Sequence, residues 1–214
     1  MTFITLLPES MQLEPGLHLF QHSLAAAEQR HVWAACRALA DGAVPMYKPI
    51  VRGGKTMSVG MLCLGRHWNA LTYRYEKART DFDGLEVPPI PPELQAIAVA
   101  AAAHAGFAMH PDICIMNFYG HDSRMGVHQD KDESRESLEA GVPIVSVSIG
   151  DTARFVVGGL SRKDPMRPIM LNSGDIMVMG GPSRLRFHGV TRILPGTAPE
   201  GTGPGRFNLT FRKG

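Results

Sequence analysis

The sequence has few cysteines, few aromatic residues and no long apolar run. Its three cysteines, Cys36, Cys63 and Cys114, lie far apart and form no CxxC pair, which argues against a disulfide framework or a thiolate zinc site. No stretch approaches the length of a membrane-spanning helix. The N-terminal MTFITLLPES also lacks the basic start and unbroken apolar core of a signal peptide. We therefore expect a cytoplasmic protein without membrane contact.

A large excess of charge is also lacking. Twenty-two basic and 20 acidic residues give a net charge of +2, so the total does not indicate nucleic-acid binding. The distribution is uneven, because the segment from Arg52 to Arg79 holds one acid, Glu76, and six basic residues. The basic residues are Arg52, Lys55, Arg66, Arg74, Lys77 and Arg79, and the aromatic residues among them are Trp68, Tyr73 and Tyr75. This composition suits a nucleic-acid surface; the alternative is a solvated basic face whose aromatics fill their own small core.

The order of sequence patterns predicts an α+β fold. A chain of 214 residues with 44% hydrophobic content suits one domain with a sizeable core. A helical pattern runs from a capping Ser23 to Asp41, and a second begins near Glu93 and ends at Gly106. After Asp112 the sequence becomes a series of short β-rich runs separated by turn residues. Their spacing is typical of an antiparallel sandwich or barrel that follows the helices.

The stretch GVHQDKDE places His128, Asp130 and Asp132 two residues apart. On a strand these side chains would share one face, and Lys131 and Glu133 would point the other way, into solvent. His188 lies on a later β-rich run, RFHGV. Two imidazoles and one carboxylate are the set that holds Fe(II) while leaving coordination positions open. The stretch therefore indicates either a metal site or a solvated acidic edge.

The last β-rich run, RFNLTFR, has strict two-residue alternation. Arg206, Asn208, Thr210 and Arg212 fall on one face, and Phe207, Leu209 and Phe211 fall on the other. If the apolar face packs into the sandwich, two guanidinium groups point into the protein and need anions. The arginine fork matches a carboxylate, so a dicarboxylate between them would satisfy both. The alternative is an edge strand with its polar face in water.

Taken in this order, the motifs resemble those of the AlkB family of Fe(II)- and 2-oxoglutarate-dependent dioxygenases. The segments NFY, VHQDKDE, PIVSVSIG, GGPSRLRFHGV and RFNLTFR match family blocks, and the similarity runs from about Met57 to Arg212. The resemblance implies a double-stranded β-helix, or jelly-roll, core over residues 89–214. An N-terminal helix and a nucleotide-recognition lid would occupy residues 1–88, in one compact unit with the core.

The resemblance also implies roles for individual residues. The iron ligands would be His128, Asp130 and His188. The residues that bind 2-oxoglutarate would be Asn117, Tyr119, Arg206, Asn208 and Arg212, with Arg206 at the distal carboxylate and Arg212 nearer the metal. The substrate would contact Trp68, Tyr73, Tyr75, Asp132 and Arg162, with Trp68 stacked on the base and Asp132 at its exocyclic amine. Arg184 falls on a loop that meets nucleic acid or shapes the site.

The implied activity is oxidative demethylation of N1-methyladenine and N3-methylcytosine in DNA. It would use Fe(II), 2-oxoglutarate and O2 and release formaldehyde, succinate and CO2. Because the damaged base must leave the stack, single-stranded DNA would be preferred, with RNA as a further substrate, and we expect a monomer. Two alternatives stay open: the same iron chemistry on RNA or a protein side chain, and a non-catalytic jelly-roll module that binds a metal or a sugar.

Overall fold

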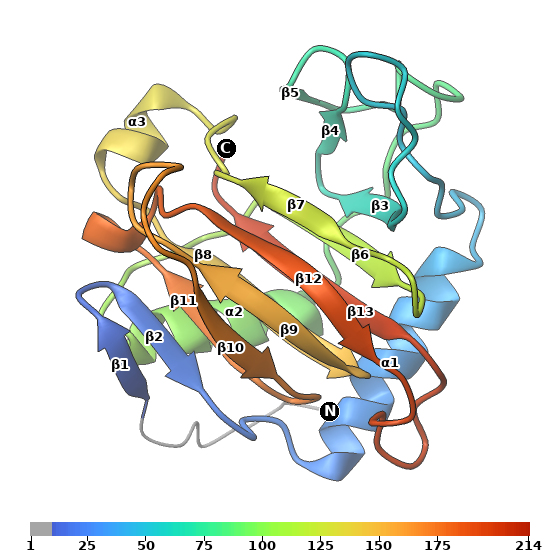
Figure 1. Cartoon of the computed structure of the whole chain (residues 1–214). Coiled ribbons are helices and arrows are strands. Elements are labelled where there is room, and N and C mark those ends of the chain that lie inside the picture. The colour runs from blue at the N-terminus through green and yellow to red at the C-terminus, as the bar shows by residue number, and fades with distance from the viewer. Residues whose placement is uncertain (1–9) are drawn as a thin grey trace.

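Two antiparallel sheets face each other in the computed structural model, which describes residues 10–214 (Figure 1). The larger sheet has the order β1 (Met11–Glu14), β2 (Leu17–Phe20), β11 (Ile176–Met179), β8 (Ile144–Gly150), β13 (Arg206–Arg212), β6 (Ile113–Tyr119) and β3 (Gly60–Leu64). The smaller sheet has the order β10 (Arg167–Leu171), β9 (Thr152–Val157), β12 (His188–Leu194) and β7 (Met125–His128). This arrangement confirms the α+β class and the jelly-roll core. The expectation about a signal peptide concerns residues 1–9, which lie outside the described residues.

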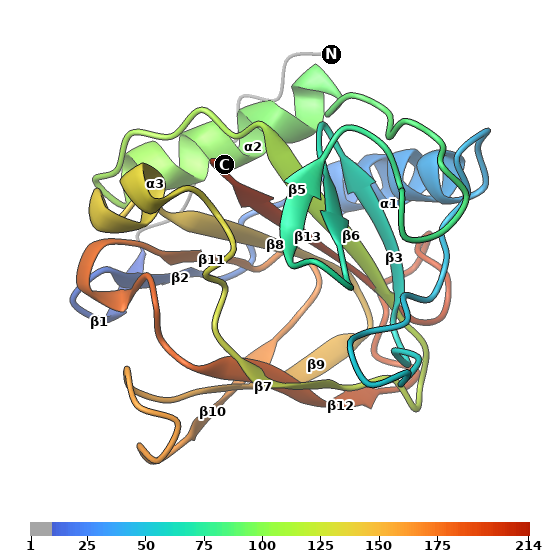
Figure 2. The ribbon, with the colours of Figure 1, turned by 90° about the horizontal axis from the view of Figure 1, so that it is seen from above.

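The helices α1 (Ala26–Ala40) and α2 (Pro92–His104) cover the outer face of the larger sheet (Figure 2). The predicted cap of the first helix is wrong. The Ser23 hydroxyl donates to the Phe20 carbonyl, and the carboxylate of Glu28 accepts the N–H of Ala25 at 2.8 Å. The Glu28 side chain therefore caps the helix at Ala25, two residues after Ser23. Gly106, with φ of +82°, follows α2 as expected.

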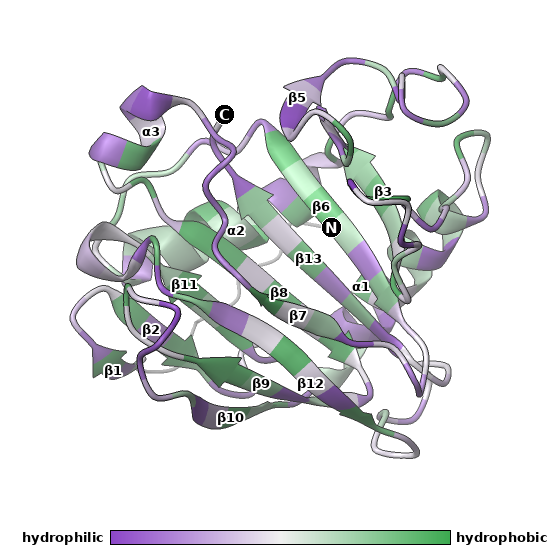
Figure 3. Ribbon diagram, turned by 45° about the horizontal axis from the view of Figure 1, so that its top comes forward, coloured by the Kyte–Doolittle hydropathy of each residue, from purple (hydrophilic) through white to green (hydrophobic). Residues whose placement is uncertain are grey.

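The alternation along β13 divides the sandwich into an apolar and a polar layer. Phe207, Leu209 and Phe211 are at most 1% exposed and pack beneath the helices, and Trp33 of α1 meets Phe207 edge to face. Hydrophobic and hydrophilic residues alternate along the strand (Figure 3). Since β13 pairs with β6 on one side and β8 on the other, its polar face has a fixed position between the two sheets.

A small hairpin, β4 (His67–Asn69) with β5 (Arg74–Glu76), stands beside the two large sheets (Figure 1). We call residues 65–87, which contain it, the lid segment. The buried His67 Nε2 lies 2.6 Å from Asp81 Oδ1. Arg79 is fully buried, pairs with Asp83 and donates to the Pro45 carbonyl at 2.6 Å. The prediction of a basic face is therefore wrong for Arg79, which holds the lid segment together.

Two further helical turns, α3 (Arg135–Glu139) and η1 (Gly181–Ser183), lie at the end of the sandwich where β7 stops (Figure 1). The larger sheet also includes strands from before residue 88. The division of the chain into a lid and a core at that residue therefore stays a proposal about function.

None of the helices within residues 10–214 combines the length and apolar character that crossing a membrane requires.

The loop from β12 to β13 depends on one buried carboxylate. Asp151 Oδ1 accepts the N–H groups of Thr197 at 3.0 Å and Ala198 at 2.9 Å, and Oδ2 accepts that of Gly205 at 2.8 Å. Asp151→Ala leaves these donors without their charged acceptor. We expect it to lower the free energy of unfolding by about 2–4 kcal/mol, measured by urea denaturation.

The matched control is Asp41→Ala, because Asp41 forms an exposed i, i+4 pair with Arg37. Such a pair contributes less than about 0.5 kcal/mol. Similar losses in the two variants would show that the Asp151 hydrogen bonds do not hold the loop.

Candidate active site

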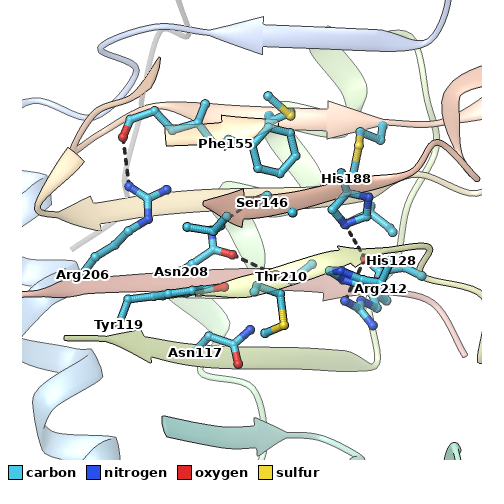
Figure 4. A pocket seen from close by; sticks show the side chains of 18 residues that line it. Asn117, Tyr119, His128, Ser146, Phe155, His188, Arg206, Asn208, Thr210 and Arg212 are labelled. Carbon is cyan, nitrogen blue, oxygen red and sulfur yellow. Dashed lines mark hydrogen bonds and ion pairs between the residues drawn. The ribbon is translucent and has the colours of Figure 1, made fainter. Parts of the chain in front are cut away.

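A pocket lies between the two sheets, and most of the predicted site residues line it (Figure 4). Its empty space, including the part open to solvent, is about 550 Å³. The predicted residues that line it are Asn117, Tyr119, His128, Asp130, His188, Arg206, Asn208 and Arg212. The apolar part of the wall includes Ile144, Phe155, Leu171, Met177, Met179 and Val190. The pocket therefore combines an apolar wall with polar groups at both ends, as small-molecule sites do.

His128, Asp130 and His188 converge at one end of this pocket. His128 and His188 are register partners on β7 and β12, with ring centroids 4.5 Å apart. Each Nε2 lies 3.5 Å from an oxygen of Asp130, and the potential ligand atoms are all within 4.8 Å of one another. The strand ends at His128, so the prediction that Asp130 continues a strand is wrong. Asp130 reaches the cluster from the loop beyond β7.

The orientation of the two imidazoles suits a metal ion. Each Nδ1 faces a main-chain carbonyl, of Gly126 for His128 and of Arg186 for His188. Because a carbonyl only accepts, each Nδ1 carries the hydrogen and each Nε2 presents a lone pair when the ring is neutral. Burial tends to raise the pKa of Asp130, but the Arg212 guanidinium and the two imidazoles hold it well below its usual range. Two imidazole nitrogens and a carboxylate are a set that fits Fe(II).

Arg206 lies at the opposite end of the pocket (Figure 4). It is 1% exposed, and it donates to the Leu171 carbonyl at 3.0 Å and to the Ser148 hydroxyl at 2.6 Å. Burial lowers the pKa of Arg206 to about 10. No carboxylate within residues 10–214 forms an ion pair with it, and its Nε has no hydrogen-bond partner there. A buried cation without an anion is costly, so this end of the pocket suits an anionic ligand.

Arg212, in contrast, already has anionic partners. Its Nη2 lies 2.9 Å from Asp130 Oδ2, and its Nη1 lies 3.4 Å from Glu133 Oε1 and donates to the Tyr75 hydroxyl at 2.8 Å. Burial tends to lower the pKa of Arg212, but Asp130 and its other neighbours raise it above its usual value. Arg212 is therefore held beside the metal cluster, which is the end where the resemblance puts it.

Between the two arginines, β6 and β13 present amides. Asn117 and Asn208 are register partners. The Asn208 side chain donates to Ser146 Oγ at 2.8 Å, whereas the buried Asn117 Oδ1 has no hydrogen-bond partner among the described residues. An unsatisfied buried oxygen costs about 1–3 kcal/mol, and a bound group that carries an N–H or O–H would satisfy it. Tyr119, 2% exposed, closes the wall next to them.

The lid segment places its aromatic residues in different positions. Trp68 Nε1 donates to Asp132 Oδ2 at 2.8 Å, and the Tyr75 hydroxyl donates to Glu133 Oε1 at 3.2 Å. Tyr73 is 37% exposed, has a left-handed φ of +58° and lies 5.7 Å from the Trp68 ring. The sequence does not distinguish the roles of Tyr73 and Tyr75. The structure brings the Tyr75 hydroxyl to Arg212, which lines the pocket, and leaves Tyr73 on the surface.

Two charged residues differ from expectation. Glu133 was expected in solvent, but its side chain is fully buried between Arg184 and Arg212, because the chain is no longer extended after His128. Arg184, expected on a loop near nucleic acid or the site, is 3% exposed and bonds to the main chain of Asp130. Arg162 is exposed, and its guanidinium lies over the Phe187 ring at 5.1 Å.

Comparison with known proteins gives consistent results. The model of the 2OG-Fe(II) oxygenase superfamily matches residues 16–212. An Alpha-ketoglutarate-dependent dioxygenase AlkB homolog of Caulobacter vibrioides is 38% identical, over 98% of this chain and 93% of that protein. The Arabidopsis thaliana DNA N(6)-methyladenine demethylase ALKBH1C is 39% identical over 94% of this chain. The chain spans about half (49%) of that relative's length. The solved structure described as "The structure of OsALKBH1" has a TM-score of 0.90 and 37% identity, and the match covers 96% of this chain and 100% of that one.

The converging triad predicts that a divalent cation stabilises the fold. At a free Mn(II) concentration 100 times the dissociation constant, a single site adds about 2.7 kcal/mol. We therefore expect Mn(II) to raise the melting temperature, measured by circular dichroism. We expect His188→Ala to abolish most of the increase, since it removes one of three ligands.

His110→Ala is the control, because His110 is exposed and outside the triad. It should keep the full increase. A full increase in His188→Ala as well would mean that Mn(II) binds elsewhere.

Proposed function

Because the chain belongs to the AlkB family of Fe(II)- and 2-oxoglutarate-dependent dioxygenases, we propose that it removes alkyl groups oxidatively from the bases of DNA. One observation carries the proposal. A single pocket has a set of metal ligands at one end and, at the other, the buried Arg206 without an anion. These two ends suit a metal ion and a dicarboxylate that reaches from it, as the family chemistry requires.

In the proposed site His128, Asp130 and His188 hold Fe(II), and Arg206 binds the distal carboxylate of 2-oxoglutarate. Bound Fe(II), with 2-oxoglutarate and O2, supplies the oxidation of the methyl group. Arg212 stays beside Asp130 and the metal-bound end, and the side-chain N–H of Asn117 donates to the co-substrate. The apolar wall around Phe155 and Leu171 excludes water from the reacting atoms. In the net reaction the methyl group leaves as formaldehyde, and 2-oxoglutarate becomes succinate and CO2.

The lid segment supports a base as the substrate. Trp68 offers a ring on which a base out of the stack can lie. Asp132 Oδ2 accepts a hydrogen bond from the indole, and a carboxylate can accept from further donors as well. A carboxylate next to the platform favours cationic bases such as N1-methyladenine and N3-methylcytosine. The amino groups of these bases would donate hydrogen bonds to it. The exposed cations that would contact phosphates are Arg52, Lys55, Arg74, Lys77 and Arg162.

N6-methyladenine in DNA is a second candidate substrate. The Arabidopsis relatives at 38–39% identity are named for its demethylation. It is neutral and keeps one N6–H, which could donate to the Asp132 carboxylate. Because it lacks the positive charge, the carboxylate would favour it less than N1-methyladenine.

The central test is mass spectrometry of single-stranded oligonucleotides, each with one N1-methyladenine or one N6-methyladenine, after incubation with the protein, Fe(II), ascorbate, O2 and 2-oxoglutarate. We expect the loss of one methyl group from the N1-methyladenine strand only in the complete mixture. His128→Ala should lose turnover while binding the oligonucleotide nearly as well as the wild type, because its imidazole holds metal rather than DNA.

Parallel duplex DNA and RNA arms rank the substrates. Full turnover by His128→Ala would overturn the iron assignment. Succinate formed without loss of methyl from any strand would favour the protein-substrate alternative, and no succinate at all would favour a non-catalytic binding module.

Stacking on Trp68 gives a separate prediction. Base–aromatic stacking contributes about 1–3 kcal/mol per base, so Trp68→Ala should raise KM for the methylated strand by roughly tenfold or more. Its 2-oxoglutarate turnover without DNA should stay near the wild-type rate. Trp68→Phe keeps a ring but loses the hydrogen bond to Asp132. Its KM should therefore lie between the values of the wild type and of Trp68→Ala. An unchanged KM in Trp68→Ala would exclude Trp68 as the platform.

A further inference from the structure

Arg184 is a buried guanidinium that neither metal nor 2-oxoglutarate binding accounts for. It follows η1, four residues before His188, and is 3% exposed. Its Nε donates to the Val142 carbonyl at 2.9 Å, and its Nη1 donates to the Asp130 carbonyl at 2.7 Å. Its Nη2 lies 2.9 Å from Glu133 Oε2, as an ion pair without the alignment of a hydrogen bond. One side chain thus joins three segments of the chain.

Asp130 needs such support because the sheet does not hold it. The register pairing of β7 with β12 ends at His128 and His188, two residues before Asp130. Past that point the two ligand-bearing segments are tied by side chains. Arg184 binds the Asp130 carbonyl, and Gln129 Nε2 donates to the Leu185 carbonyl at 2.6 Å in the opposite direction. The two bonds cross-link the loop that carries Asp130 to the segment that leads into His188.

The ion pair with Glu133 has a second effect. Glu133 lies between Arg184 and Arg212, and Arg212 pairs with Asp130 at 2.9 Å. The four charges balance: two guanidinium groups and two carboxylates. Without the charge of Arg184, Glu133 would have Arg212 as its only cationic partner among the described residues and would compete with Asp130 for it.

We propose that Arg184, with Gln129, is a positioning residue of the metal centre: it fixes the main chain of Asp130 against the segment of His188 so that the carboxylate meets both imidazoles. The proposal rests on the proposed function, because it concerns the same metal site. Groups that orient metal ligands from behind change metal affinity by about 10–100-fold when removed. A residue that only fills space would change the stability of the fold and leave the affinity of the folded protein unchanged.

The test is Mn(II) affinity, measured without DNA or 2-oxoglutarate from the electron paramagnetic resonance signal of the free ion. It is done below the melting temperature of every variant, as determined by circular dichroism. Arg184→Lys keeps the charge but cannot reach three acceptors at once. We expect it to weaken Mn(II) binding about tenfold or more. Gln129→Ala removes the companion bond at a half-buried position, and we expect a smaller loss of several-fold.

Arg79→Lys is the matched control. Arg79 is as deeply buried as Arg184 and binds one carboxylate and one carbonyl, but it lies in the lid segment. Its melting temperature should fall like that of Arg184→Lys, with Mn(II) affinity within twofold of the wild type. Wild-type affinity in folded Arg184→Lys or in Gln129→Ala would overturn the proposal. If the wild-type protein bound no Mn(II), the metal site itself would be wrong, which is a distinguishable failure.

Discussion

The site depends on a buried group of alternating charges, Arg184, Glu133, Arg212 and Asp130. Buried ions are tolerated only when each has a partner, and here each carboxylate lies within 3.4 Å of a guanidinium group. The metal end of the pocket is therefore balanced before any ligand binds. Arg206, at the other end, has no ion-pair partner in the part of the chain that the structure describes. The two ends thus differ in kind: one is complete, and the other requires an anion from outside.

The pairing of the strands explains why Arg206 and Arg212 stay a fixed distance apart. Arg206 and Arg212 are the first and last residues of β13, which is paired along its length with β6 and for most of it with β8. A strand in the middle of a sheet cannot slip without exposing its apolar face, and Phe207 and Phe211 are buried under the helices. The hydrophobic layer thereby fixes the spacing of the polar groups, and a ligand has to match that spacing.

The sequence predicted residues on paired strands correctly and misplaced some residues on loops. Alternation assigned the faces of β13 correctly because a paired strand has a strict two-residue period. The same assumption failed for Glu133, since β7 ends at His128 and no local signal marks that end. Arg79 and Ser23 were misplaced for a related reason. Arg79 reaches the Pro45 carbonyl from a distant part of the chain, and the Ser23 hydroxyl turns back to the Phe20 carbonyl. Helix and strand periodicity predicts neither contact.

The loop that follows β7 also joins the pocket to the lid segment. Asp132 and Glu133, consecutive in the chain, accept hydrogen bonds from Trp68 and Tyr75, which are register partners in the hairpin β4–β5. Tyr75 in addition accepts from Arg212. The surface proposed for a base and the surface proposed for 2-oxoglutarate are therefore two sides of one hydrogen-bonded wall. A ligand that displaced Arg212 would therefore disturb its hydrogen bond to Tyr75. Because coupling between sites is reciprocal, a group that displaced the hairpin would disturb Arg212 in turn.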